Sequence, residues 1–226
     1  MAGPVLALLV LTALAAIASL ALGDALLPPR QILGALFGRG DELARTVLWE
    51  IRLPRTLVGL AVGSALGASG AVMQAFFRNP LASPGLLGVS SGGALGAVAA
   101  LAFAGATASL FLVPLASILG AFLATGAVML MARRGASPEH LLLGGVALNA
   151  LFGAATSFLL VASSANVQSS SKIIFWLMGG IENRTWEHVW MSLPLVLASC
   201  LLLLPLGRAM NILALGESGA QSLGVD

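Results

Sequence analysis

The side chains that most often perform chemistry are few in this chain and form no recognisable catalytic pattern. Its 226 residues include two histidines, His140 and His188, and a single cysteine, Cys200. No GxxxxGK[ST] phosphate loop and no HExxH or CxxC metal pattern occurs. Glu182, Glu187 and His188 are close in sequence, but no convergent set of acid, base and nucleophile surrounds them. The sequence therefore predicts no enzyme active site, no metal and no ATP site on this chain.

Composition indicates a protein that lives in lipid. Charged residues make up 9% of the chain and the hydrophobic types 58%, whereas a soluble domain carries about 25% charged residues. So few charges cannot cover a soluble fold with groups that water hydrates, whereas a bilayer accepts apolar surface. The cations are scattered rather than gathered into a basic stripe, which argues against nucleic-acid binding.

The apolar runs predict an all-α, polytopic transmembrane bundle. A spanning helix needs about 20 apolar residues, and short polar or Pro- and Gly-containing segments separate such runs here. A cleaved signal peptide is the alternative for the first run, but no Lys or Arg precedes it and it is long for that purpose. We expect six spans, at 3–23, 56–77, 92–103 (short), 109–131, 141–161 and 189–206, short helices near 31–37 and 172–178, and a polar tail from 208.

A stripe of glycines marks the second predicted span. Gly59, Gly63 and Gly67 are spaced four apart, so they share one helix face and would let another backbone approach closely. We expect this face to be a helix-packing surface.

No predicted span carries an internal acid or base. A secondary transporter coupled to protons or sodium usually keeps such a group at mid-membrane, so we expect the energy for any transport to come from a separate subunit. A secondary transporter or channel subunit is the main alternative, and a membrane enzyme is a second one.

Several segments together resemble one family, the permeases of importers for iron–siderophore, haem and vitamin B12. The matching segments follow the family's order along the chain, so together they are far more specific than any one alone. They are IRLPRTL at 51–57, VGSALGASGAVMQ at 62–74, RNPLASPGLLGVSSG at 78–92, LLLGGVAL at 141–148, WLMGG at 176–180, NILALG at 211–216 and SLGV at 222–225.

This resemblance implies a multi-pass subunit of the bacterial inner membrane with about ten helices, of which residues 1–226 hold the N-terminal portion as a single transmembrane domain. The implied partners are a second permease subunit, two ATP-binding subunits and a periplasmic substrate-binding protein, with ATP bound by the partner and no cofactor on this chain. The implied cargo is an iron chelate or cobalamin. Because about four helices would be missing, we expect a truncation of the gene product or of the structure.

The resemblance also assigns roles to particular residues. Arg52 and Arg55 match external arginines that pair with acids of the binding protein; anchoring of the second span at the interface is the alternative. Asn79 and Leu81 match a cytoplasmic gate, for which a plain connecting turn is the alternative. Ser137 and Pro138 align with a second gate element, although a small polar residue is expected at position 138.

The same comparison places the start of an ATPase-coupling segment at 208–226. Gly216, Glu217, Ser222, Leu223 and Gly224 match its short helices, which in the family would transmit rigid-body motion. A loose tail is the alternative for this chain in isolation.

Charge alone predicts the opposite orientation from the resemblance. With the N-terminus in the cytoplasm, six crossings leave four cations inside and seven outside, which the positive-inside rule disfavours. The inner four are Arg78, Arg133, Arg134 and Arg208. The outer seven are Arg30, Arg39, Arg45, Arg52, Arg55, Lys172 and Arg184. Contact of some outer arginines with a partner would account for part of the excess.

Overall fold

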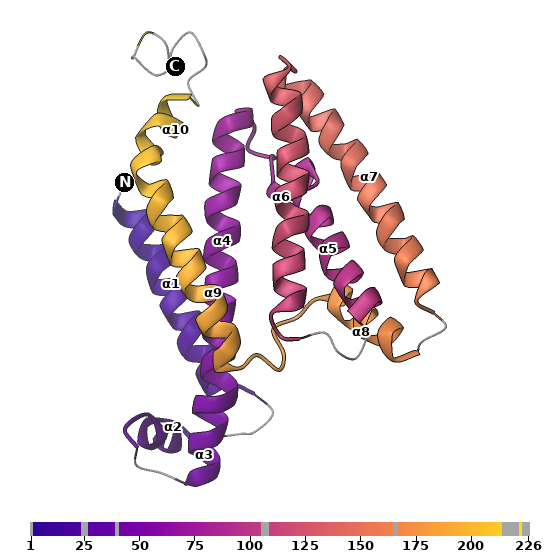
Figure 1. The fold of residues 1–226 in the computed structure, drawn as a ribbon. Helices are drawn as coiled ribbons and strands as arrows, with labels where there is room; N and C mark the ends of the chain where they lie inside the picture. The colour runs from indigo at the N-terminus through magenta and orange to yellow at the C-terminus, as the bar shows by residue number, and fades with distance from the viewer. Residues whose placement is uncertain are drawn as a thin grey trace. The chain divides into compact units, whose positions relative to one another are not determined.

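Every regular element in the described part of the chain is a helix, which confirms the all-α prediction (Figure 1). The structure is a computed structural model that describes residues 2–23, 27–38, 41–104, 109–164, 167–213 and 222. Its contacts divide the chain into two compact units. Unit 1 comprises Met1–Ala68 and Ile181–Gly207, and unit 2 comprises Ser69–Gly180 and Arg208–Asp226.

Five helices in the described ranges are long and apolar enough to cross a membrane, and a sixth apolar helix is shorter. They correspond one to one with the six expected runs, including the short third one, which confirms a polytopic bundle. The five are Gly3–Ala21, Glu42–Phe77, Leu112–Arg133, Pro138–Ala162 and Trp186–Leu213, and the shorter one is Val89–Ala104. The expected short helices are also present, as α2 (Pro29–Leu36) and α8 (Val167–Met178).

Two helices extend beyond the ranges predicted for them. The second span begins earlier, because α3 (Glu42–Thr46), a π-helix (Val47–Arg52) and α4 (Leu53–Phe77) follow one another without a break. At the other end, α9 (Trp186–Leu203) continues through a 3₁₀ turn into α10 (Gly207–Leu213). The last apolar helix therefore extends to Leu213, into the segment expected to be a polar tail. In both places the sequence contains charged residues or glycine, so the helix was not predicted there. The helix forms because it continues from the neighbouring apolar run.

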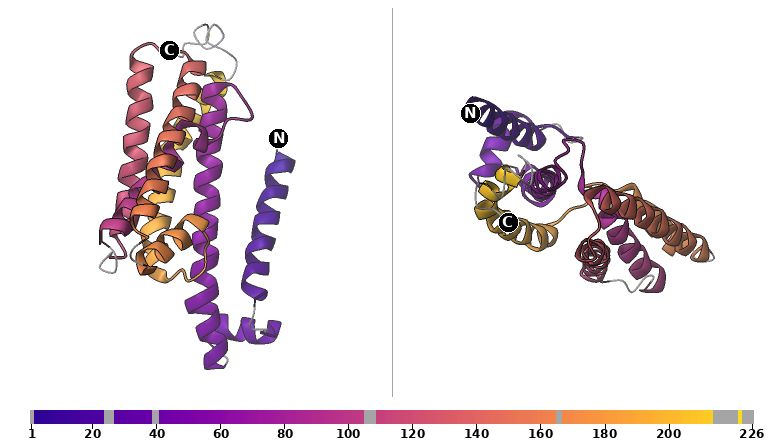
Figure 2. Two further views of the ribbon diagram at one scale, coloured as in Figure 1. Left: turned by 90° about the vertical axis from the view of Figure 1, so that its right-hand side faces the viewer. Right: turned by 90° about the horizontal axis from the view of Figure 1, so that it is seen from above.

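Unit 1 has its small apolar core where α2 meets α3 and the π-helix. Ile32 and Ala35 from α2 pack against Ala44 and Leu48, and Leu48 has no exposed surface. Figure 2 shows α2 folded against the end of the long α3–α4 helix. The amphipathic α2 is thus held in place by burying one face.

Two tryptophans join distant parts of unit 1. The Trp186 indole N–H donates to the Trp49 carbonyl oxygen at 2.9 Å, and the Trp49 indole N–H donates to the Ala35 carbonyl oxygen at 3.1 Å. The two rings stack with centroids 6.5 Å apart. A buried indole needs a partner for its N–H, so these bonds fix the start of α9 to the π-helix and the π-helix to α2.

Phenylalanine at position 186 is expected to lower the stability of unit 1 modestly. A smaller aromatic ring would remain beside Trp49, but the Trp49 carbonyl oxygen would lose its donor, a loss of about 1 kcal/mol. The measurement is thermal unfolding of the purified protein in detergent. Trp190→Phe is the matched control because Trp190 lies on the same helix and is 72% exposed. Equal melting temperatures for the two variants would contradict the assigned role.

Unit 2 is organised around a close pair of helices, α5 (Val89–Ala104) and α6 (Leu112–Arg133), with α7 (Pro138–Ala162) packed on α5. Glycine makes the pair possible. A Cβ built on Gly92 would lie 2.7 Å from the Gly120 carbonyl oxygen, and one built on Gly96 would overlap the Ala116 carbonyl oxygen. The two backbones are therefore in direct contact, as small residues allow in membranes.

Helix α8 closes one end of unit 2. Ile173, which has no exposed surface, packs with Val98 and Leu101 of α5, and Trp176 covers this cluster. The short helix is therefore a structural part of the bundle.

The glycine stripe of α4 is only partly used inside the chain. A Cβ on Gly59 would lie 3.5 Å from Cδ1 of Ile181, an ordinary contact. No other described atom of unit 1 lies within 4 Å of a Cβ built on Gly63 or Gly67. The expected packing face is thus occupied at its first position alone, and its use at the other two stays a prediction.

Much of the apolar surface of the long helices faces outward. Leu6 and Leu9 of α1, Phe122 of α6 and Leu202 of α9 are all more than 60% exposed. Exposed apolar surface on this scale is typical of helices that hydrocarbon or other membrane helices surround.

Candidate docking, gate and coupling sites

The two candidate docking arginines have different surroundings. Arg55 is exposed, whereas Arg52 is only 6% exposed. The Arg52 guanidinium donates to the carbonyl oxygens of Leu20 and Ala21, at 2.7 and 3.0 Å. These are the last carbonyls of α1 (Ala2–Ala21), which lack partners within their own helix. The end of α1 therefore buries Arg52, and its expected contact with the binding protein stays a prediction.

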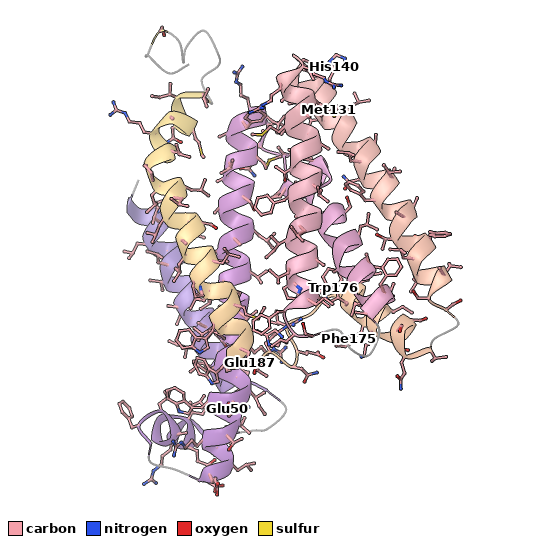
Figure 3. All side chains as sticks on the ribbon, in the orientation of Figure 1. Glu50, Met131, His140, Phe175, Trp176 and Glu187 are labelled. Atoms are coloured by element: carbon pink, nitrogen blue, oxygen red, sulfur yellow. The ribbon has the colours of Figure 1, made fainter. Side chains whose placement is uncertain are left out.

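Arg55 instead lines a cleft of about 510 Å³ within unit 1. The cleft lies between the π-helix and the segment that leads into α9, and Figure 3 shows one of its residues, Glu50, on the long helix. Its lining residues are Glu50, Ile51, Arg55, Glu182, Asn183, Arg184 and Thr185. The lining carries both carboxylates and guanidinium groups, so a protein that binds in this cleft would need opposite charges facing each of them.

The first pair of candidate gate residues belongs to a tight turn after α4. Arg78 ends the helix with φ of 48°, a left-handed conformation. The Asn79 side-chain oxygen accepts the Leu81 backbone N–H at 2.9 Å, and the Asn79 carbonyl oxygen accepts the Ala82 N–H at 3.0 Å. Asn79 thus shapes the turn, and Leu81, at 83% exposed, projects from it.

The second pair begins α7. Ser137 is the N-cap residue and Pro138 the first helical residue, where proline's missing N–H costs nothing. The Ser137 Oγ and His140 Nδ1 atoms are 2.9 Å apart. Figure 3 shows His140 and Met131 at the end of unit 2 opposite Trp176. The hydrogen bonds of the described residues do not join this pair to Asn79 or Leu81.

The segment between the gate turn and α5 enters unit 2 as irregular backbone. A 3₁₀ turn (Pro84–Leu87) is followed by Gly88 with φ of 80°. The Asn149 side-chain amide, from α7, donates to the carbonyl oxygens of Gly85 at 2.9 Å and Leu86 at 3.4 Å. Backbone carbonyls at membrane depth require such donors.

Most of the candidate coupling residues lie outside the described residues, namely Gly216, Glu217, Leu223 and Gly224. Ser222 is described as helical and exposed. Within the expected segment 208–226, the Leu213 carbonyl oxygen accepts a hydrogen bond from the Arg78 Nε at 3.2 Å. The start of the expected coupling segment is therefore bonded to the residue that precedes the gate turn.

No group of three or more His, Cys, Asp or Glu side chains gathers in the ranges that the structure describes. Those residues hold no metal-ligand set, and the geometry is that of a helical membrane scaffold with charged clefts in unit 1 and an irregular segment in unit 2.

Comparison with known proteins decides the family. The FecCD transport family matches residues 10–226, which is nearly the whole chain. The chain belongs to the FecCD transport family. The family is one of transport components, and this chain is a multi-pass protein of the inner (cytoplasmic) membrane.

Two curated FecCD relatives are permeases for cobalamin. The chain is 43% identical over 187 residues to the cobalamin import system permease protein BtuC of Halobacterium salinarum, a match covering 82% of this chain and 49% of that protein. It is 40% identical over 216 residues to the vitamin B12 import system permease protein BtuC of Citrobacter koseri, covering 96% and 63%. The chain therefore spans about half to two thirds of these relatives.

A solved structure supports the same FecCD assignment. It shows an inward-facing conformation of a protein assigned as a metal-chelate type ABC transporter. The TM-score is 0.86 at 34% identity, with 100% of this chain and 69% of that chain covered. The helix arrangement found here is thus shared with an ABC transporter.

Sequence reasoning missed three features of this FecCD chain. They are the π-helix at Val47–Arg52, the α5–α6 contact through Gly120, and the polar side chain of Asn149 inside a span. Asn149 could have been found, because an amide inside an apolar run of 21 residues, 141–161, requires a partner. Asn149 was not singled out because an amide is neither an acid nor a base.

Proposed function

We propose that this chain is the membrane permease subunit of an ATP-driven importer that carries an iron chelate or cobalamin across the inner membrane. The observation that carries the proposal is the family match over residues 10–226, together with a TM-score of 0.86 to a metal-chelate type ABC transporter. The working importer would contain a second permease subunit, two ATP-binding subunits and a periplasmic binding protein, with ATP bound by the ATP-binding subunits.

The proposed path for cargo is wide and weakly polar. The runs 56–77, 89–104, 112–132, 141–162 and 189–207 contain no Asp, Glu, Lys, Arg or His. A secondary transporter would need such a group within a span to couple transport to an ion gradient. This supports an importer whose energy comes from the ATP-binding subunits.

The proposed residue roles come from the family resemblance, except that of Arg52, which comes from its contacts with α1. Arg55 docks the binding protein. Arg52 holds the end of α1 in place. Asn79 and Leu81 form one gate element, and Ser137 with Pro138 forms the other. The coupling role is proposed for the segment from 208, including Gly216, Glu217, Ser222, Leu223 and Gly224.

Reconstitution tests the function. The permease would be assembled with its ATP-binding subunit in proteoliposomes, and the binding protein loaded with labelled ferric siderophore, haem or cobalamin. ATP-dependent uptake of one of these supports the proposal. Uptake that proceeds without ATP, or no uptake of any of the three, counts against it.

Reversing the charge at position 55 is expected to weaken docking. Glutamate in place of Arg55 would repel the acidic partner, so association of the binding protein should slow and its affinity fall about tenfold. Surface plasmon resonance at low and high salt measures this directly. Arg45→Glu is the matched control, because Arg45 is also an exposed arginine of unit 1 but lines a different cleft. Equal loss in both variants would mean that net charge, not Arg55, guides docking.

A further inference from the structure

Asn149 is a polar side chain near the middle of a membrane-spanning helix, α7 (Pro138–Ala162). Its Nδ2 donates to the carbonyl oxygens of Gly85 and Leu86. Its Oδ1 accepts the hydroxyl of Ser91 at 2.6 Å, and this hydroxyl also lies 3.0 Å from the Gly88 carbonyl oxygen. Every polar group of the amide therefore has a partner, and all the partners come from residues 85–91.

The backbone of α7 is shaped to receive the same segment. A Cβ on Gly145, one turn before Asn149, would overlap the Leu86 carbonyl oxygen and lie 2.8 Å from the Leu87 Cα. A Cβ on Gly88 would lie 3.0 Å from the Leu148 Cβ. Residues 85–88 thus rest directly on α7, and the glycine at 145 is what permits this approach.

These contacts argue against one obvious role for Asn149. An amide inside a transport protein would ordinarily be considered as a contact for cargo. Here both of its donor hydrogens and its acceptor oxygen are engaged with the protein itself. Its function is therefore to hold other parts of the chain in place.

We propose that Asn149 is a positioning residue that fastens residues 85–91 to α7, so that the gate turn at residues 79–82 follows the movements of α7. This rests on the proposed transport function. The gate turn directly precedes the fastened segment, and Ala82 at its end is only 3% exposed. Without the amide, the Leu86 carbonyl oxygen would lose its side-chain donor and the Gly85 carbonyl oxygen would keep only the 3.4 Å bond from the Gly88 N–H, so the segment would find other positions.

The first test follows the segment itself and needs no cargo. A nitroxide label would be placed on Leu81→Cys in a Cys200→Ser background, and its mobility measured by EPR in the full-length permease in lipid. Asn149→Leu should increase the label's mobility. Thr125→Val should not, because the Thr125 hydroxyl bonds only to Ala121 of its own helix. Unchanged mobility in Asn149→Leu would overturn the proposal.

The second test measures coupling in the assembled transporter. Asn149→Leu should reduce uptake at least about tenfold while ATP hydrolysis stays within about twofold of the parent. Asn149→Gln, which keeps the donors, should recover part of the uptake. Uptake and hydrolysis that fall together with the melting temperature would reduce Asn149 to a stabilising residue and overturn its positioning role.

The two tests separate this inference from the function on which it rests. If the unaltered importer shows no ATP-driven uptake, the proposed function fails, while the EPR result still decides whether Asn149 fastens the segment. If Asn149→Leu does not assemble, Ser91→Ala removes one bond of the same cluster and should give a smaller increase in mobility. No increase in that variant would also count against the proposal.

Discussion

Alanine at Gly96 is expected to destabilise unit 2 by about 1–3 kcal/mol, the usual cost of overpacking a close contact. The added methyl group would overlap the Ala116 carbonyl oxygen and lie 3.4 Å from the Gly120 Cα. Both neighbours are backbone, so no side chain can rotate away, and α5 and α6 must separate. The measurement is the apparent melting temperature in detergent, which we expect to fall by roughly 5 °C or more.

Gly126→Ala provides the matched control for this prediction. Gly126 lies on α6, the helix that faces Gly96, and among the described residues no atom of another element is within 4 Å of a Cβ built there. Alanine has the better helix propensity by about 1 kcal/mol, so this variant should be as stable as the parent or more stable. A stable Gly96→Ala protein would show that α5 and α6 do not pack as closely as the structure has them.

The sequence predicted the helices well because the signal for them is local. A run of about 20 apolar residues without a charge has few alternatives in a membrane protein. The structure therefore confirms six apolar helices, including the short α5. Boundaries were less accurate where the helix continues into polar sequence, at Glu42–Arg52 and at Arg208–Leu213.

The contacts between helices could not be predicted in the same way. Gly59, Gly63 and Gly67 have the spacing of a packing face, yet a Cβ on Gly63 or Gly67 would meet no described atom of unit 1. Gly120 and Gly145 have no such spacing and lie against another backbone. Whether a glycine is needed depends on what faces it, and that is decided by residues far away in the sequence.

Arg52 illustrates the same limit for charge. The positive-inside count gives every cation the same weight, whatever its contacts in the folded protein. Arg52 is instead committed to the carbonyls that end α1. Capping of α1 therefore gives one of the seven cations expected outside a role within the chain. The sequence shows the charge but not the helix end, 31 and 32 residues earlier, that needs it.

Methionine at position 52 is expected to destabilise unit 1 by about 2–3 kcal/mol. It keeps most of the apolar stem but removes a charged donor, and hydrogen bonds to charged groups contribute about 1.5–3 kcal/mol. The Leu20 and Ala21 carbonyls would then lose this donor at the end of a helix, where no backbone N–H replaces it. Gly23 would gain no compensating contact, because it lies against the guanidinium itself. Thermal unfolding in detergent measures the loss.

Comparison with Arg55→Met separates capping from docking. Arg55 is exposed, so its replacement should leave the free energy of unfolding within about 0.5 kcal/mol of the parent's while weakening the binding protein's affinity. Arg52→Met should do the reverse, because the guanidinium that it removes faces α1. Its free energy of unfolding should fall, and the folded fraction should bind the binding protein almost normally. If Arg52→Met melted like the parent and lost docking, the guanidinium would have to leave α1 for the binding protein, and the capping role would be wrong.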